Sequence, residues 1–548
     1  MTTASTTARP TSAAPWPDDL TGVTTLTRFM LRRDRVRLPA WAAGFGAFVV
    51  YLAVALPTAY VTTDDLDSIM AMFRDPVGRM LTGPGYGLDD PTYARLIANG
   101  YGLYFLLLAG LMNILLVVRH TRAEEQSGRA ELVGANVVGR YAALTAALVV
   151  ALLTNGAVVV VVAATMVAVG GFGIGGSLLF GASIAAFGLA IAGLTALTAQ
   201  LSEGSRAAAG LAGAALGAAF VLRAVGDMAR SGGNALSWLS PLGWSQQTAP
   251  FVLDRWWPLA LPLALAVVTT VAAYAQSTRR DLGASRFAVH AGPARATASL
   301  GTPLGLAWRL QRPAIVWWTV ALAVSGVVFG AFADSLLDAV GDMPDVFIEV
   351  FGAEDLLAGY LAYMAVFMAY LASTFAVLAI QAMRNDETSG RGEALLATPI
   401  GRRGWLVSNL AVTTAGVVVI MAVTGLATGI GAAVATGDAA HVGELTLAHL
   451  NQIPAVLVVL GVAALLFGTR PRAIPATWAL VAYGVLVGTF GRLLDLPGLA
   501  LDISPFEHLA RMPLVAVELL PVVVLIALAA ATTALASLTF RRRDITVS

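Results

Sequence analysis

Residues 122–140 read RAEEQSGRAELVGANVVGR, and residues 384–402, 262 positions later, read RNDETSGRGEALLATPIGR. Nine of the nineteen aligned positions are identical, and Glu124 aligns with Asp386, which carries the same charge. We refer to these stretches as the first and second motifs. Their unbroken alignment indicates that the chain contains an internal duplication.

The composition lies outside the range of soluble domains. Of the 548 residues, 57% are hydrophobic and only 12% are charged, and the mean hydropathy is +0.76. These values are typical of a polytopic membrane protein. A membrane-crossing helix needs about 20 apolar residues. Segments near that length predict twelve spans, at 40–61, 101–118, 141–169, 178–201, 207–222, 259–276, 314–332, 356–383, 406–434, 454–468, 474–490 and 514–540.

Two shorter matches extend the duplication. Ser240-Pro241 aligns with Ser504-Pro505 at an offset of 264, and Arg280-Asp281 aligns with Arg543-Asp544 at an offset of 263. We therefore predict an all-α polytopic membrane protein of about twelve transmembrane helices, arranged as two six-helix halves. Because six is even, both halves enter the membrane in the same orientation, as parallel repeats with pseudo-twofold symmetry about the membrane normal.

The predicted domain organisation has four parts. They are a disordered tail at 1–19, a first six-span half with an N-terminal amphipathic helix at 20–277, a cytoplasmic linker with a pre-span helix at 278–312, and a second half at 313–548. In LTRFMLRRDRVRL, residues 26–38, arginines alternate with apolar residues. That pattern predicts an amphipathic helix lying on an anionic membrane surface.

Arginine also predicts the orientation. The chain has 34 basic residues, all of them arginine, and cytoplasmic loops carry the excess of positive charge. With a cytoplasmic N-terminus, 26 arginines fall on the inner side and 8 on the outer side. We therefore expect both termini and both motifs to face the cytoplasm.

The residue inventory excludes several kinds of site. The absence of cysteine removes disulfides and thiolate sites, and five scattered histidines favour no metal site. A net charge of +1 without a basic, aromatic tract gives no reason to expect nucleic acid. Without lysine the chain cannot form a phosphate-binding loop of the GxxxxGKS or GxxxxGKT type. We expect no catalytic or cofactor-binding residue here, and any ATP must be hydrolysed by another polypeptide.

The motifs allow four interpretations. Glu125 and Arg129 have the i,i+4 spacing of a helical ion pair, which contributes only about 0.2 to 0.5 kcal/mol, and Glu387 with Arg391 repeats it. Alternatively, each Ser-Gly pair marks a turn between short interfacial helices. A solvated loop that only satisfies topology is the third, but topology requires no matched acidic residues. We favour a docking surface for a soluble partner, formed by Arg122, Glu124, Glu125, Ser127, Gly128, Arg129, Glu131, Arg384, Asp386, Glu387, Ser389, Gly390, Arg391 and Glu393.

Five stretches carry a resemblance to a known family: LRRDRVRLPAW at 31–41, HTRAEEQSGRAEL at 120–132, LSPLGWSQQTAPFVLDRWWPL at 239–259, MRNDETSGRGEALLATPIGRRGW at 383–405 and ISPFEHLARMP at 503–513. The chain resembles the membrane subunits of bacterial ATP-binding-cassette exporters. Within them it is similar to the fused twelve-span permeases associated with polyketide-antibiotic and multidrug export in actinobacteria. The resemblance covers nearly the whole chain.

The resemblance implies a location and partners. The chain would lie in the bacterial plasma membrane and work with two copies of an ATPase subunit that binds ATP and Mg²⁺. Residues 122–131 and 384–393 would be coupling helices seated in grooves of those subunits. Residues 26–38 would form an elbow helix on the inner leaflet, whereas LAWRLQR at 306–312 is less basic than the family pattern requires.

Charged residues within the spans are few, because each costs about 2.5 to 3.5 kcal/mol at mid-membrane. We therefore expect a hydrophobic or amphipathic cargo. Glu518, near the outer end of the last span, aligns with Arg255, which predicts either a pair across the pseudo-twofold axis or interfacial anchoring. Arg223 with Asp227, and likewise residues 492 and 495, predict local ion pairs at span ends.

Two other functions are compatible with this architecture. A proton-coupled twelve-span drug transporter also has two parallel halves, but it needs an intramembrane carboxylate, and Glu518 is the one candidate. A membrane enzyme would have to use Asp64-Asp65 or Asp89-Asp90 on the outer side. No catalytic constellation surrounds those pairs in the sequence.

Overall fold

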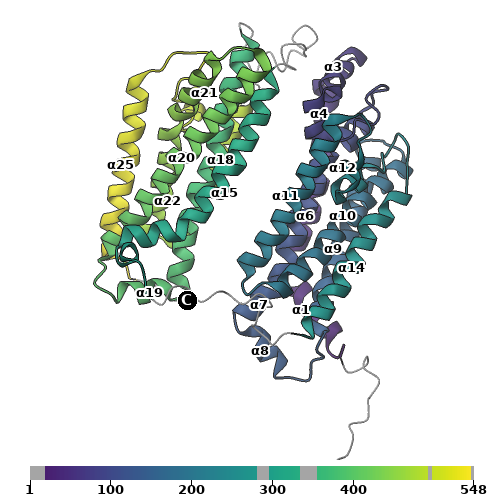
Figure 1. Cartoon of the computed structure of the whole chain (residues 1–548), viewed down its shortest axis with the longest axis horizontal. Helices are drawn as coiled ribbons and strands as arrows, with labels where there is room; N and C mark the ends of the chain where they lie inside the picture. The colour runs from purple at the N-terminus through teal and green to yellow at the C-terminus, as the bar shows by residue number, and fades with distance from the viewer. Residues whose placement is uncertain (1–18, 280–294, 334–354, 491–496, 545–548) are drawn as a thin grey trace, which may run out of the picture. The chain divides into compact units, whose positions relative to one another are not determined.

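The computed structural model describes residues 19–279, 295–333, 355–490 and 497–544. The chain folds as two compact units, residues 1–290 and 291–548, and each is described by itself. Every regular element among the described residues is a helix (Figure 1). The predicted disordered tail lies outside the described residues except for Asp19.

The first unit contains six long apolar helices. They are α2 (Arg37–Ala59), α6 (Gly102–His120), α9 (Ala142–Ala168), α10 (Ile174–Leu201), α11 (Ser205–Ala229) and α14 (Ala260–Ser277). All six predicted spans of this half fall on them, although α11 has 25 residues and is longer than the predicted segment 207–222. The additional residues of α11 include Arg206, Arg223 and Asp227, which end the apolar segment without breaking the helix.

Helix α10 forms the centre of the first unit and packs on α14, α9, α6 and α11. Small residues allow this close approach, since a Cβ placed on Gly193 would lie 2.7 Å from the carbonyl oxygen of Ala266 in α14. Asn113 of α6 and Asn155 of α9 are buried and exchange two amide hydrogen bonds, of 3.2 and 2.8 Å. Their polar groups are thereby satisfied inside the apolar bundle.

The second unit is built from α15 (Pro303–Ala331), α18 (Leu356–Thr388), α20 (Arg402–Thr436), α21 (Ala440–Asn451), α22 (Ile453–Thr469), α23 (Ala476–Phe490) and α25 (Leu519–Arg542). Helix α15 packs along α20, where a Cβ on Gly326 would lie 2.6 Å from Thr428 Oγ1. Helices α22 and α25 form the other large contact. The core of the unit lies between these pairs, around Phe375 and Phe467.

Eleven stretches in the described part of the chain are long and apolar enough to cross a membrane, against twelve predicted. The tenth is the continuous run of α21 and α22, Ala440–Thr469, which has 30 residues and is twice as long as the predicted segment. The predicted eleventh span corresponds to α23, whose 15 described residues reach about 22 Å at 1.5 Å per residue. That is shorter than a hydrocarbon core of about 30 Å.

The segments before the first span of each unit differ. In the first unit, α1 (Val23–Arg33) is separated from α2 by a break at Asp34. It buries Thr27 and Met30 and packs against α9, whereas Arg28 and Arg32 are exposed. In the second unit, α15 begins at Pro303 and continues through Pro313. The pre-span helix predicted within 278–312 is therefore part of the spanning helix, and the predicted separation from the second half is wrong.

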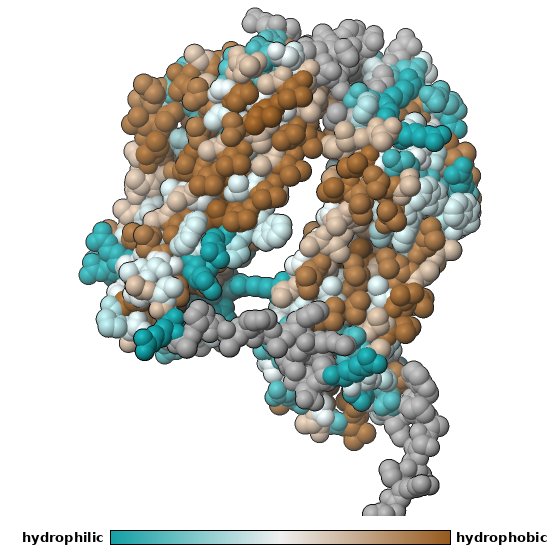
Figure 2. All heavy atoms as spheres, in the orientation of Figure 1, coloured by the Kyte–Doolittle hydropathy of each residue, from teal (hydrophilic) through white to brown (hydrophobic). Residues whose placement is uncertain are grey.

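In Figure 2 hydrophobic side chains cover the middle of the long helices in each unit, and hydrophilic residues gather near the helix ends. Different elements occupy the two ends of the first unit (Figure 1). One end has α1, α7 (Arg122–Gln126) and α8 (Arg129–Gly134), and the other has α3 (Thr63–Arg74), α4 (Pro76–Thr82) and α12 (Ala235–Trp238). The first motif lies at the former end.

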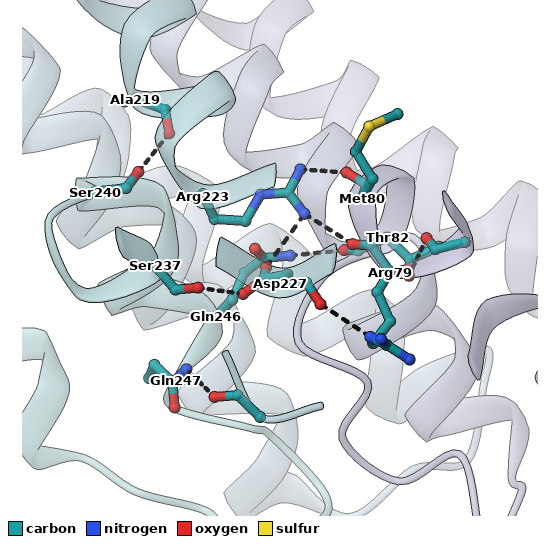
Figure 3. A network of polar contacts seen from close by, with 12 residues as sticks. Arg79, Met80, Thr82, Ala219, Arg223, Asp227, Ser237, Ser240, Gln246 and Gln247 are labelled. Atoms are coloured by element: carbon teal, nitrogen blue, oxygen red, sulfur yellow. Dashed lines mark hydrogen bonds and ion pairs between the residues drawn. The ribbon is translucent and has the colours of Figure 1, made fainter. Parts of the chain in front are cut away.

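A polar network closes the end of the first unit opposite the first motif (Figure 3). Arg223 of α11 is fully buried and donates to the carbonyl oxygen of Met80, 2.7 Å away, near the end of α4 (Pro76–Thr82). Arg79 of α4 donates in return to the carbonyl oxygen of Asp227, 2.9 Å away, near the end of α11. The Asp227 carboxylate lies 3.4 Å from Arg223 and accepts a 2.6 Å hydrogen bond from Ser237.

The predicted ion pair between Arg223 and Asp227 is thus present, and each arginine supplies donors to the carbonyl end of the other helix. Carbonyl groups at helix C-termini have no partner within the helix, and arginine suits them in charge and donor number. The network therefore fixes α4 on α11. The corresponding residues of the second half, 492 and 495, lie outside the described residues.

Candidate partner-docking motifs

Both motifs form a helix, a left-handed glycine and a second short helix. In the first motif, α7 (Arg122–Gln126) is followed by Gly128 with φ 72° and by α8 (Arg129–Gly134). In the second, the last turn of α18 is followed by Gly390 with φ 75° and by α19 (Arg391–Leu396). Only glycine adopts this backbone conformation without steric strain. The interpretation of Ser-Gly as a turn between helices is therefore confirmed, but only the first motif has a short helix on both sides of the turn, since α18 has 33 residues.

The predicted pairs of Glu125 with Arg129 and of Glu387 with Arg391 are wrong. Arg129 contacts Glu124 instead, with Nε 2.9 Å from Oε2, and the i,i+4 rule fails because it applies only within a continuous helix. The left-handed glycine turns the chain so that the arginine folds back to the acidic residue five positions earlier.

The second motif repeats this arrangement. Arg391 contacts Asp386, with Nη2 2.7 Å from Oδ1. The serine also has the same partner, since Ser127 Oγ donates to the carbonyl oxygen of Glu124 at 3.0 Å and Ser389 Oγ donates to that of Asp386 at 3.2 Å. One local geometry therefore occurs twice, once in each unit.

The second acidic residue of each motif points inward. Glu125 forms an ion pair with Arg122, whose side chain is fully buried. Glu387 is 5% exposed and lies 2.7 Å from Arg543 Nη2, at the end of α25. Both glutamates are therefore paired inside their units, and they hold the motif in place instead of facing outward.

Further contacts attach the first motif to neighbouring helices. Glu124 also pairs with Arg33 at the end of α1, and Asp34 lies 3.0 Å from Arg119 in the last turn of α6. Gln126 accepts hydrogen bonds from the backbone and hydroxyl groups of Ser205, at 3.1 and 2.6 Å, at the start of α11. A displacement of this motif would therefore also displace α1 and α11.

The second motif is attached through the end of its unit's last helix. Arg543 contacts Glu387, and its guanidinium stacks over the rings of Phe467 and Phe540, at 5.3 and 5.4 Å from their centroids. Arg402, at the start of α20, donates to the carbonyl oxygen of Arg543 at 2.7 Å. These contacts connect the second motif with α20, α22 and α25.

The exposed faces of the motifs combine charge with apolar surface. Glu131 and Glu393 are exposed, and the side chains of Arg129 and Arg391 are 55% and 60% exposed. Beside them, residues that the sequence analysis missed are open to solvent, with Leu132 72% and Val137 89% exposed. The sequence signal that could have identified them is the presence of large apolar residues within a charged loop. Arg384 is only partly exposed.

Glu518 and Arg255 lie in different units. Glu518 is exposed and precedes α25, so it is not inside the last helix as the predicted span 514–540 implied. Arg255 is partly buried, with its guanidinium 6.0 Å from the ring centroid of Tyr86. Their predicted pair stays a prediction.

The eleven membrane-capable stretches in the described part of the chain define the class as multi-pass membrane proteins. Residues 24–276 and 300–541 match the family described as the multidrug efflux system permease Rv1217c, C-terminal domain. The chain is also 37% identical over 544 residues to the multidrug efflux system permease protein Rv1217c of Mycobacterium tuberculosis, covering 96% of this chain and 95% of that protein. The chain belongs to this family of multidrug efflux permeases.

Proposed function

We propose that the chain is the transmembrane permease subunit of an ATP-binding-cassette exporter. Two copies of a separate ATPase subunit would bind ATP and Mg²⁺, one copy docked on each motif, and this chain would hydrolyse no ATP. The observation that carries the proposal is the motif geometry, which recurs in both units with the arginine folded onto the same acidic position. Two equivalent docking sites suit a partner that works as a pair.

The attachments of the motifs support a mechanical role. A docking element transmits motion only if it is held rigidly to the helices that must move. Glu124 and Gln126 hold the first motif to α1 and α11, and Glu387 holds the second to α25. Closure of the ATPase pair on ATP would pull on both motifs and shift these helices within each unit.

The exposed chemistry suits a protein partner. Stable interfaces combine an apolar centre with a polar rim, and Leu132 and Val137 supply apolar surface beside the exposed Glu131 and Arg129. A loop that only sets topology needs neither the apolar residues nor the acidic ones. The arginine distribution supports a cytoplasmic position for this surface.

The cargo is proposed to be hydrophobic or amphipathic, such as an antibiotic, a drug or a lipid. Within the described spans of the first unit, the buried Arg223 and Asp227 are used to join α11 to α4. They therefore do not offer a binding site for a charged solute. The multidrug efflux permease to which the chain is similar supports outward transport of drugs.

The docking proposal is tested by Leu132→Asp, with Leu239→Asp as the matched control. Leu239 is 64% exposed and follows α12 (Ala235–Trp238) at the opposite end of the first unit. Burying a leucine contributes about 1.5 to 3 kcal/mol, so Leu132→Asp should weaken ATPase association by about 10- to 100-fold. The measurement is the ATPase that copurifies with each tagged variant. Equal copurification from the two variants contradicts docking at the first motif.

The alternative is a proton-coupled drug transporter. That mechanism needs a carboxylate within the membrane, and Glu518 is exposed and lies before its helix begins. The position of Glu518 therefore favours the ATP-driven mechanism.

A further inference from the structure

A cavity of about 480 Å³ lies behind the first motif. Its walls come from α1, the end of α6, both short helices of the motif and the start of α9. Cavities of about 300 to 1,000 Å³ hold drug-sized molecules. The cavity is bounded by the motif and α1, and it shares Arg129 with the docking surface, whereas Leu132 and Val137 do not line it.

The walls are amphipathic. Phe29, Met30 and Leu144 form an apolar side, and Arg33, Arg129 and Arg140 line the polar part. Two glutamates of the first motif also line it, so three arginines outnumber two carboxylates by one positive charge. An occupant should therefore combine an apolar portion with a negatively charged group.

A second observation points to a ligand. His120 lines the cavity and is 2% exposed, and within the described residues its Nδ1 atom has no hydrogen-bond partner. Its Nε2 atom lies 2.8 Å from Asp34 Oδ2, but neither ring nitrogen has a hydrogen-bond partner among the described residues. A neutral imidazole offers one donor and one acceptor nitrogen. Because buried polar atoms are normally paired, a hydroxyl group in the cavity would satisfy Nδ1.

We propose that the cavity binds an anionic phospholipid with a hydroxyl-bearing headgroup. The phosphate contacts the arginines, and a headgroup hydroxyl forms a hydrogen bond with His120. The part of an acyl chain nearest the headgroup packs on Phe29 and Met30. Helix α1 forms one wall of the cavity through Phe29, Met30 and Arg33, whereas Arg32 is exposed and does not line it. The lipid would come from the inner leaflet if the proposed orientation of the chain is correct. The site itself does not depend on that orientation.

The site connects lipid with the first motif. Arg33 pairs with Glu124, and the same glutamate holds Arg129. A phosphate at Arg33 competes with Glu124 for the guanidinium. Bound lipid therefore alters the contact that joins α1 to the first motif, and it makes the position of that motif sensitive to lipid composition.

The test is native mass spectrometry of the purified full-length chain with phosphatidylglycerol or phosphatidylcholine. We expect tighter retention of phosphatidylglycerol. Arg33→Gln should weaken it about 10-fold or more, as expected for loss of a charge-assisted hydrogen bond. Ala143→Trp, which fills the cavity wall, should weaken it similarly. Arg32→Gln removes the same charge from the exposed side of α1 and should leave retention unchanged.

Two results would overturn the proposal. One is equal retention of both lipids, and the other is an equal loss in the Arg33→Gln and Arg32→Gln variants. Glycerol 1-phosphate supplies the headgroup without the tail, and displacement of the lipid by it at equal concentration would identify a free phosphate site instead. If Ala143→Trp fails to fold, the two arginine variants still decide. No ATPase is required, so failure here is distinguishable from failure of the proposed function.

Discussion

Replacing the left-handed glycines of both motifs tests the link between their backbone and their function. Gly128 and Gly390 have φ of 72° and 75°, and a Cβ built on either would meet no atom within 4 Å. Gly128→Ala and Gly390→Ala therefore introduce no clash. Their whole effect comes from the left-handed backbone, which is unfavourable for alanine by about 1 to 2 kcal/mol.

That free energy sets the size of the measurable effect. A penalty of 1 to 2 kcal/mol raises the population of locally opened motif by about 5- to 30-fold. Hydrogen exchange of the purified variants measures this directly, in peptides covering 121–135 and 385–397. Amide hydrogens that form backbone hydrogen bonds in these peptides should exchange faster by the same factor. One example is the Ser389 amide, which donates to the carbonyl oxygen of Asn385 at 3.1 Å.

Gly134→Ala is the matched control. Gly134 lies in α8, and a Cβ there would also meet nothing within 4 Å. Because alanine is favoured over glycine in a helix by about 0.5 to 1 kcal/mol, exchange should slow in this variant. Two results would show that the left-handed turn does not hold the motif. One is that Gly128→Ala exchanges no faster than the unaltered chain, and the other is that Gly134→Ala exchanges as fast as Gly128→Ala.

Three further perturbations probe the rest of the framework. Arg543→Gln removes the ion pair with the nearly buried Glu387 and should destabilise the second unit by about 2 to 4 kcal/mol, measured as a lower melting temperature. Asp227→Asn leaves Arg223 buried with an uncompensated charge and should cost about 3 to 5 kcal/mol. A smaller loss in the double variant Asp227→Asn with Arg223→Met would confirm the coupling, and an additive loss would refute it. Asp65, in α3 (Thr63–Arg74), accepts a hydrogen bond from the backbone N–H of Thr62, which lowers its pKa below 3.8. This contribution to the start of α3 is complete at neutral pH and is lost as the pH falls through the lowered pKa. Exchange of α3 amides should show that acid loss, and Asp65→Asn should abolish the pH dependence.

The sequence predicted features that follow from local rules. Span positions follow from hydropathy, and the turns at Gly128 and Gly390 follow from the preference of glycine for a left-handed backbone. Spacing rules failed where the helix did not continue. Glu125 and Arg129 stand four residues apart, yet the turn between them sends Arg129 to Glu124.

Contacts between segments that are distant in the sequence could not be predicted from sequence patterns. Arg543 and Glu387 are 156 positions apart, and no periodicity connects them. Leu132 and Val137 were missed because the charges of the motif dominated its interpretation, although exposed apolar side chains in such a loop are themselves a signal.

The central claim is that ATP hydrolysis on a separate subunit drives transport through this chain. The most direct measurement is drug efflux from liposomes containing the purified chain, with and without the ATPase that copurifies with it. We predict efflux that requires both the ATPase and ATP and that persists when a protonophore collapses the proton gradient. Efflux by the chain alone, driven by a proton gradient without ATP, would contradict the account.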